Sequence, residues 1–178
     1  MRRLLVLLLL AIGVPAVLSG CADAPGLAPV PGPDAVYLDA MVPHHAQALE
    51  LAALVPGRDA SPAVAALATR IDRDQVEEIG QLEGLRRSRG WPAGAGVHAH
   101  GTDGMADPAA LEQLRGPAFD RLWLATMTRH HEGAIAMARE HLATGTDETL
   151  RRFSQVLLAT QSGEIDAMRA AASTIAGP

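Results

Sequence analysis

Residues 34–52 read DAVYLDAMVPHHAQALELA, and residues 120–138 read DRLWLATMTRHHEGAIAMA. The second stretch repeats the first at an offset of 86 residues without a gap. Three distinctive residues recur in it: Met41, His44 and His45 return as Met127, His130 and His131. The match continues downstream, where Gln75 and Glu78 return as Gln161 and Glu164. A repeat of this length covers a whole supersecondary unit, so the chain is predicted to contain one helical hairpin twice.

The spacing of apolar residues indicates an all-α fold. They recur at intervals of three and four after residue 34, which is the period of an amphipathic helix. Four helices are predicted, at about residues 34–55, 61–89, 117–144 and 147–175, with Ser61 and Asp147 as N-caps. Asp107-Pro108 is predicted to start a short helix in the connection between the halves. Two duplicated hairpins with short internal loops are predicted to form a four-helix bundle.

The N-terminus is typical of an export signal. Arg2 and Arg3 precede an apolar run from residue 4 to residue 18, which is too short to span a membrane. It ends in Leu-Ser-Gly-Cys21, which resembles a bacterial lipobox, where the cysteine is diacylated. We therefore predict a lipoprotein signal peptide over 1–21, a Pro/Gly-rich tether over 22–33, and an extracytoplasmic protein anchored to the cell membrane through Cys21.

The mature domain is predicted over 34–178, with repeats at about 34–89 and 120–175 and a connector at 90–119. All 15 basic residues of the chain are arginines, and the formal net charge is −5. This balance argues against a nucleic acid partner, which needs a basic surface. Cys21 is the only cysteine, so disulfides and thiolate clusters are excluded. A metal site must use His, Met, carboxylate or amide ligands.

The helical projection places the imidazoles toward the core. His45 belongs to an apolar stripe with Met41 and Ala48, His44 lies at its edge, and the second copy projects in the same way. Glutamine and glutamate lie one turn apart on the second helix of each hairpin, and burying them unpaired would cost about 1–3 kcal/mol each. The facing imidazoles are their natural partners. The candidate metal ligands are Met41, His44, His45, Met127, His130, His131, Asp34, Asp120, Gln75, Glu78, Gln161 and Glu164.

Imidazole and thioether ligands together favour copper, with zinc or another divalent metal as the alternative. Possible accessory ligands are His98, His100 and Met105 in the Gly-rich connector and Met137 and Met168 in the second repeat. A single core histidine that is hydrogen-bonded to Gln or Glu is more often structural, and the duplication is what favours a metal here. No role is predicted for His141, and Arg86, Arg87 and Arg89 are expected to form a solvated helix end.

The repeated motifs resemble the bacterial family known as domain of unknown function three hundred and five. The motifs that carry the resemblance are Met41-Val42-Pro43-His44-His45, Phe119-Asp120, Met127-x-x-His130-His131-Glu132-Gly133-Ala134, and Gln161-x-x-Glu164-Ile165-x-x-Met168. The resemblance implies a ferritin-like helical fold, frequent export, and copper binding or copper tolerance in some relatives. Leu51 and Leu82 stand where the second half has Met137 and Met168, so the first half would be the weaker site if thioethers are ligands.

Three classes of function follow. The favoured one is a membrane-anchored copper-binding lipoprotein that sequesters, detoxifies or delivers metal. The second is a metal-free structural or partner-binding envelope module, in a complex or as a homo-oligomer, with a buried polar network. The third and least favoured is a di-metal oxidase, because the Glu-x-x-His pattern of such sites does not occur. No nucleophile or cofactor motif is found, so we do not expect an enzyme.

Overall fold

The computed structural model of the protein describes residues 32–91, residue 93 and residues 107–176. The predicted signal peptide with Cys21, and the proposed accessory ligands His98, His100 and Met105, lie outside these residues. None of the described helices is long and apolar enough to cross a membrane.

The described residues form helices and no strands, which confirms the all-α prediction. The helices are α1 (Pro33–Ala53), α2 (Pro62–Arg89), α3 (Ala109–Glu112), α4 (Gly116–Thr144) and α5 (Glu148–Ala176). The four long helices begin and end within two residues of the predicted positions. The short helix α3 follows Asp107 as expected, and the Ala109 backbone N–H donates to the Asp107 carboxylate over 2.9 Å.

Side chains fix where α2 and α5 begin. The hydroxyl of Ser61 accepts a hydrogen bond from the backbone N–H of Val64, and Pro62 occupies the first turn, where its missing N–H costs nothing. The carboxylate of Asp147 accepts hydrogen bonds from the backbone N–H groups of Thr149 and Leu150. Both predicted N-caps are therefore confirmed.

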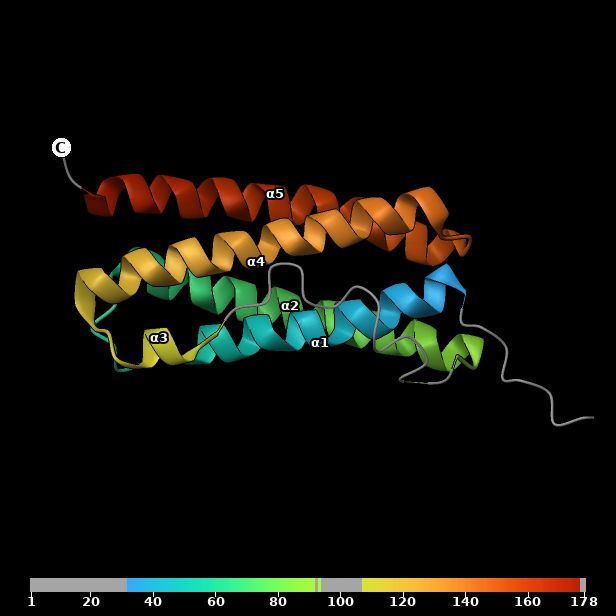
Figure 1. Ribbon diagram of the computed structural model, residues 1–178, viewed down its shortest axis with the longest axis horizontal. Helices are drawn as coiled ribbons and strands as arrows, with labels where there is room; N and C mark the ends of the chain where they lie inside the picture. The colour runs from blue at the N-terminus through green and yellow to red at the C-terminus, as the bar shows by residue number, and fades with distance from the viewer. Residues whose placement is uncertain (1–31, 92, 94–106, 177–178) are drawn as a thin grey trace, which may run out of the picture. The chain divides into compact units, whose positions relative to one another are not determined.

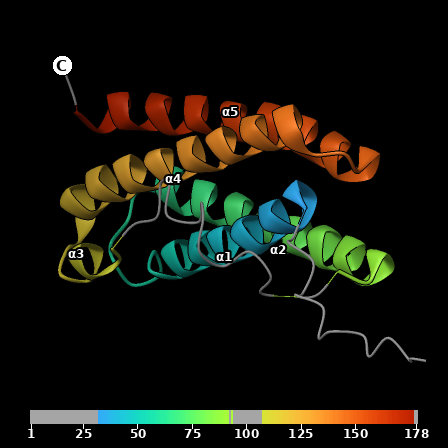
Figure 2. The ribbon, with the colours of Figure 1, turned by 45° about the vertical axis from the view of Figure 1, so that its right-hand side comes forward.

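The bundle consists of two hairpins, α1–α2 and α4–α5, with α1 packed on α4 and α2 on α5 (Figures 1 and 2). The end of α2 lies beside the start of α5, because Arg89 Nε donates to the Asp147 carboxylate over 2.7 Å. The start of α2 lies beside the start of α4, where the Ser61 N–H donates to Asp120. The connection from α2 to α4 therefore joins opposite ends of the bundle. One long crossover of this kind is the ferritin-like topology.

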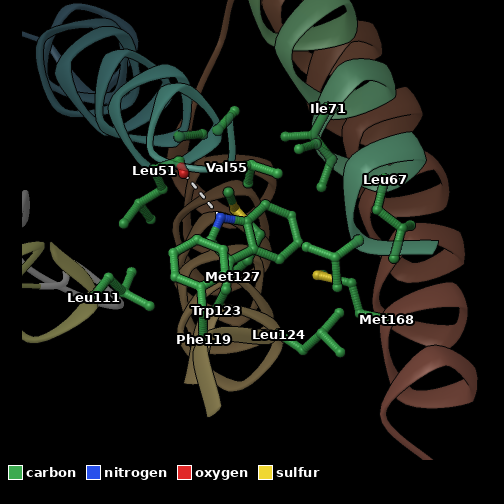
Figure 3. Packing of buried hydrophobic residues seen from close by; sticks show 14 of the residues in the cluster. Leu51, Val55, Leu67, Ile71, Leu111, Phe119, Trp123, Leu124, Met127 and Met168 are labelled. Carbon is green, nitrogen blue, oxygen red and sulfur yellow. Dashed lines mark hydrogen bonds between the residues drawn. The ribbon is translucent and has the colours of Figure 1, made fainter. Parts of the chain in front are cut away.

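Two apolar clusters lie in the interior. In the first, the indole of Trp123 packs with Phe119 and with Leu111 of α3, and its Nε1–H donates to the Leu51 carbonyl over 2.8 Å (Figure 3). The second cluster gathers around Met41, with aliphatic side chains from all four long helices. Burial of these side chains supplies most of the driving force for folding. On α1 and on α4 alike, the two histidines of the motif lie between residues of one cluster and residues of the other.

The C-terminal end of α2 differs from the expectation of a wholly solvated arginine group. Arg86 is buried and forms an ion pair and a hydrogen bond with the carboxylate of Asp39 on α1. Asp39 is itself buried between the helices and needs a cation, which the long arginine side chain reaches while its stem covers apolar surface. Arg86 thus joins α1 to α2 rather than lying in water.

Candidate metal site

The four histidines of the repeated motif are buried where α1 packs against α4. The rings of His44 and His130 lie against each other, with centroids 3.8 Å apart and planes tilted by 35°. The Nε2–H of His130 donates to the backbone carbonyl of His44 over 3.0 Å. His45 and His131 lie on either side of this central pair, with ring centroids 6.5 Å from His44 and 6.1 Å from His130, respectively.

Each outer histidine is held by a glutamate of its own hairpin. His45 Nε2 lies 2.8 Å from Glu78 Oε2, and His131 Nε2 lies 2.9 Å from Glu164 Oε2. In each half the histidine comes from the first helix and the glutamate from the second. The structure therefore brings together the imidazoles and carboxylates that the repeat predicted to face each other.

These contacts determine which ring nitrogen carries the proton. An ionised carboxylate can only accept hydrogen bonds, so His45 and His131 donate from Nε2, and in the neutral ring the lone pair lies on Nδ1. The same holds for His130, because a carbonyl oxygen also only accepts. The Nδ1 atoms of His45, His130 and His131 are buried and have no hydrogen-bond partner among the described residues. A buried imidazole lone pair whose opposite nitrogen donates to a carboxylate is the arrangement that metal-binding histidines adopt.

The electrostatics keep the central ring neutral. Burial is the main reason that the pKa of His130 is lowered to about 2; like charge on His44, His131 and His45 contributes, and the hydrogen bond to the His44 carbonyl opposes the shift. A neutral imidazole is the form that binds a metal ion. His130 is therefore ready to act as a ligand at neutral pH without losing a proton.

We call His44, His45, His130 and His131 together the histidine layer. The glutamines and methionines of the motif are also buried. Gln75 and Gln161 lie one turn before the glutamates, and their side-chain oxygens have no hydrogen-bond partner among the described residues. Met41 and Met127 lie one turn before His45 and His131 and pack into different apolar clusters. The accessory candidates Met137 and Met168 are buried, and the sulfur of Met168 accepts a hydrogen bond from the Thr128 hydroxyl over 3.9 Å.

Among the residues that the structure describes, no three His, Asp or Glu side chains converge into a preformed metal cluster. The outer imidazoles each have one carboxylate, and the inner imidazoles have each other. The four histidines thus offer buried imidazole nitrogens, with a methionine one helical turn before each outer histidine. This set suits a soft ion of low coordination number better than zinc, which takes four ligands in structural sites.

Asp34 and Asp120 require a correction, because the structure does not bring them to the histidines. Asp34 accepts hydrogen bonds from the backbone N–H groups of Thr146 and Asp147 at the start of α5, and Asp120 accepts one from Ser61 at the start of α2. A helix rises 1.5 Å per residue, so the eleven residues from Asp34 to His45 span about 16 Å. The two aspartates tie the halves together at the ends of the bundle.

His141 has a role that the sequence did not predict. Its Nε2–H donates to Asp34 over 2.9 Å, its Nδ1 accepts from the hydroxyl of Ser154 at 2.8 Å, and the ring of Tyr37 stacks on it at 4.2 Å. Burial is the main reason that the pKa of His141 is lowered. Gly145 allows this approach, since a Cβ there would lie 2.2 Å from His141 Nε2.

Ser154, His141 and Asp34 are the residue types of a hydrolase triad, but their surroundings are structural. Ser154 is completely buried, and the hollow of about 250 Å³ beside His141 is not lined by it. A comparison of the two halves of the repeat could have predicted this cluster, because His141 and Ser154 occupy the positions of Val55 and Ala68 in the first half. Two polar residues that replace two apolar ones together indicate a buried hydrogen bond.

The model of the DUF305 family, a domain of unknown function, matches residues 34–172. The chain belongs to this family. The match covers both hairpins and every residue of the histidine layer. The expected family membership is thereby confirmed.

Solved structures of the family have the same fold. A DUF305 fragment from Deinococcus radiodurans is 32% identical, with a TM-score of 0.73, covering 82% of this chain and 99% of that one. A DUF305 protein from Streptomyces coelicolor, named as a secreted protein, is 26% identical with a TM-score of 0.74, covering 82% of this chain and 94% of the other. No curated protein sequence matches the chain significantly.

CopM has also been solved with this fold and with metal bound. Its Cu(I)-bound form is 25% identical, with a TM-score of 0.67, and covers 79% of this chain and 96% of CopM. CopM has likewise been solved in Cu(II)-bound and Ag-bound forms.

Proposed function

We propose that this protein binds copper, as Cu(I), in the buried layer formed by its four motif histidines. The observation that carries the proposal is the pair of Glu-held imidazoles, His45 and His131, whose Nδ1 lone pairs are buried without a partner among the described residues. CopM, a relative by structure that binds Cu(I), Cu(II) and silver, supports the choice of metal.

The donor set explains the preference for Cu(I). Imidazole nitrogens are available in pairs, and a thioether, that of Met41 or Met127, lies one helical turn from each outer histidine. Two imidazole nitrogens, or two of them with a thioether sulfur, would give a two- or three-ligand arrangement. Cu(I) and Ag(I) accept such low coordination, whereas zinc is left short of ligands. Asp34 and Asp120 take no part.

The biological role that fits this site is sequestration or delivery of copper outside the cytoplasmic membrane, without a catalytic step. The lipobox at Cys21 anchors the protein to the membrane surface, and the related Streptomyces coelicolor protein, named as secreted, supports an extracytoplasmic location. The proposed ligands are buried, so bound Cu(I) is shielded from oxidants and from other ligands. This is the property that a storage or carrier protein needs.

Metal binding is tested with the double variant His45→Gln, His131→Gln. Glutamine keeps an N–H that can donate to Glu78 and Glu164, but it removes the imidazole lone pair. The wild type is expected to bind Cu(I) against a competing chelator and to show the metal by elemental analysis, whereas the variant loses at least tenfold in affinity. Equal affinity of the two proteins would reject these histidines as ligands.

A matched control removes a different buried histidine. His141→Val with Ser154→Ala introduces the residues that the first half has at the equivalent positions, and it leaves the histidine layer intact. Its Cu(I) affinity is expected to equal that of the wild type. If the wild type binds neither Cu(I) nor Ag(I) and adding them does not raise its melting temperature, the layer is a metal-free polar network, which is the structural alternative.

The lipid anchor is tested separately. The protein with its own leader is expected to fractionate with membranes and to carry diacylglycerol on Cys21, which mass spectrometry of the N-terminal peptide detects. Cys21→Ser is expected to release it from the membrane fraction. Membrane association that persists in Cys21→Ser would contradict the anchor.

A further inference from the structure

The two His–Glu pairs have different neighbours on their outer side. The Nε of Arg70 on α2 lies 3.5 Å from Glu164 Oε1, and the side chain of Glu164 is only 4% exposed. Glu78 has no arginine partner among the described residues, and its side chain is 13% exposed. The pair in the second half is thus covered by a cation, and the pair in the first half is not.

The repeat shows how this difference arises. The position of α5 that corresponds to Arg70 is Val156, whose exposed fraction is 63%. Because α2 and α5 pack against each other, a residue at position 70 faces the glutamate of α5, and a residue at position 156 faces the glutamate of α2. An arginine covers one pair, and a small apolar side chain stands at the edge of the other.

A groove of about 410 Å³ between α2 and α5 reaches Glu78, the carboxylate of the uncovered pair. Its lining includes Asp74, Glu77 and Glu78 from α2 and Val156 from α5. One cation also lines it, Arg152, which is held 3.5 Å from Glu148, and Asp74 is paired with Arg73. At the equivalent positions in the second half, Asp74 and Glu77 are replaced by Thr160 and Gly163. The carboxylates therefore concentrate at the groove beside Glu78.

We propose that the metal cation reaches the histidine layer through this groove and binds first at the His45–Glu78 pair, and that Arg70 closes the equivalent approach to His131–Glu164. The inference rests on the proposed Cu(I) function and adds the direction of loading. A groove lined by carboxylates raises the local concentration of cations, and a guanidinium at the carboxylate lowers it. The side-chain oxygen of Gln75, one turn before Glu78 on α2, is buried and has no hydrogen-bond partner among the described residues.

The test exchanges the two residues that distinguish the halves. Val156→Arg places a guanidinium beside Glu78, and Arg70→Val removes the one beside Glu164. Both positions are partly or mostly exposed, so both variants are expected to fold. In the wild type, substoichiometric Ag(I) is expected to shift the NMR signals of the His45 ring before those of His131. In the double variant Arg70→Val, Val156→Arg, the order is expected to reverse.

The rate of binding gives a second readout. Val156→Arg is expected to lower the association rate constant for Ag(I) about tenfold, the lower end of the range for electrostatic steering. Val76→Arg is the matched control, because this substitution adds the same charge at a residue that does not line the groove. Val76 lies on α2 and is 54% exposed. Its rate is expected to stay within about twofold of the wild type, because distant surface charges are screened.

The outcomes separate the two proposals. A wild type that binds Ag(I) with both rings shifting together, and with rates that Val156→Arg leaves unchanged, overturns the direction of loading and leaves the metal function standing. Equal slowing by Val156→Arg and Val76→Arg also overturns it, because net charge alone would then explain the effect. A wild type that binds no Ag(I) or Cu(I) overturns both.

Discussion

The central imidazole of His130 shows how burial sets the chemistry of a single residue. Its pKa is lowered to about 2, against 6.5 for an ordinary histidine, mainly by desolvation. Between these two values the unfolded chain binds a proton that the folded protein does not. The folded state therefore loses stability relative to the unfolded chain as pH falls below about 6.5, because only the unfolded ring gains the proton.

The first prediction concerns this loss. The free energy of unfolding is expected to decrease as pH is lowered below about 6.5 and to keep decreasing toward pH 2. One such proton gives a slope of about 1.4 kcal/mol per pH unit. Urea unfolding between pH 7.5 and 5 measures it, and His130→Asn is expected to have a shallower slope by about that amount. An identical slope in the variant would show that His130 does not titrate in this way.

The second prediction concerns the glutamates that orient the outer rings. In Glu78→Gln the amide can donate to Nε2, which moves the ring proton to Nδ1 and removes the proposed ligand lone pair. Cu(I) affinity is expected to fall about 10- to 100-fold, the usual effect of losing such a support. Competition titration with a Cu(I) chelator measures this. Glu50→Gln, on the exposed face of α1, is the control and is expected to have no effect.

At the residue scale, the sequence predicted directions around a helix better than positions along it. The helical projection placed His45 toward the core, and its side chain is buried. It contains no axial coordinate, so it could not show that Asp34 lies three turns away and binds the start of α5. The pairing of each histidine with a glutamate was predictable, because the repeat places a histidine on the first helix and a glutamate on the second helix at the same positions in both hairpins. The tautomers and the Arg70 contact needed the structure, since they depend on distances between helices.

At the scale of elements, the end of the α4–α5 hairpin differs from its counterpart in the first half. His141 and Ser154 form a buried polar pair where the first half has Val55 and Ala68. Asp34 accepts a hydrogen bond from the other ring nitrogen of His141. It also accepts hydrogen bonds from the backbone N–H groups of Thr146 and Asp147, just before α5. Burial raises the pKa of Asp34, but its hydrogen bonds to His141, Thr146 and Asp147 outweigh this and lower it. The carboxylate stays ionised at this junction.

The third prediction tests whether the pair acts as a unit. His141→Val alone leaves the Ser154 hydroxyl buried without a partner and is expected to destabilise the fold by about 1–3 kcal/mol beyond the lost packing. Adding Ser154→Ala removes the unpaired hydroxyl and is expected to recover part of that loss. Chemical denaturation of the wild type, the two single variants and the double variant gives the coupling free energy between His141 and Ser154. Additive effects would show that the two side chains do not depend on each other.

The helices themselves were largely predictable, because local signals agree with the repeat. Ser61-Pro62 and Asp147 begin α2 and α5, and Gly90, at a φ of 64°, ends α2 in the left-handed conformation that glycine favours. What local patterns could not give was the burial of Arg86. Its carboxylate partner, Asp39, lies on another helix, 47 residues earlier.

At the scale of the whole molecule, each half completes the other. Asp34 of the first half binds the start of α5, and Asp120 of the second half binds the start of α2. The central ring contact of His44 with His130 also joins the halves. A single hairpin lacks these contacts and exposes the apolar faces of its helices.

The fourth prediction follows from this division. Residues 32–93 and 107–176, produced together as two chains, are expected to associate into a stable one-to-one complex with the helicity of the intact protein. Each alone is expected to be largely unfolded or aggregated, because a lone hairpin has no core. Circular dichroism and size-exclusion chromatography measure both. A hairpin that folds alone as a monomer would contradict the dependence of one half on the other.

The cross-wise binding of helix starts by Asp34 and Asp120 also has a consequence at high protein concentration. Every contact that joins the hairpins can form equally well between two molecules that exchange their C-terminal halves. Such a domain-swapped dimer would contain two complete histidine layers, each assembled from both chains. Under the proposed lipid anchor, crowding at the membrane surface would favour this exchange, and under the proposed copper site a metal ion bridging the halves of one layer would also hold two proteins together.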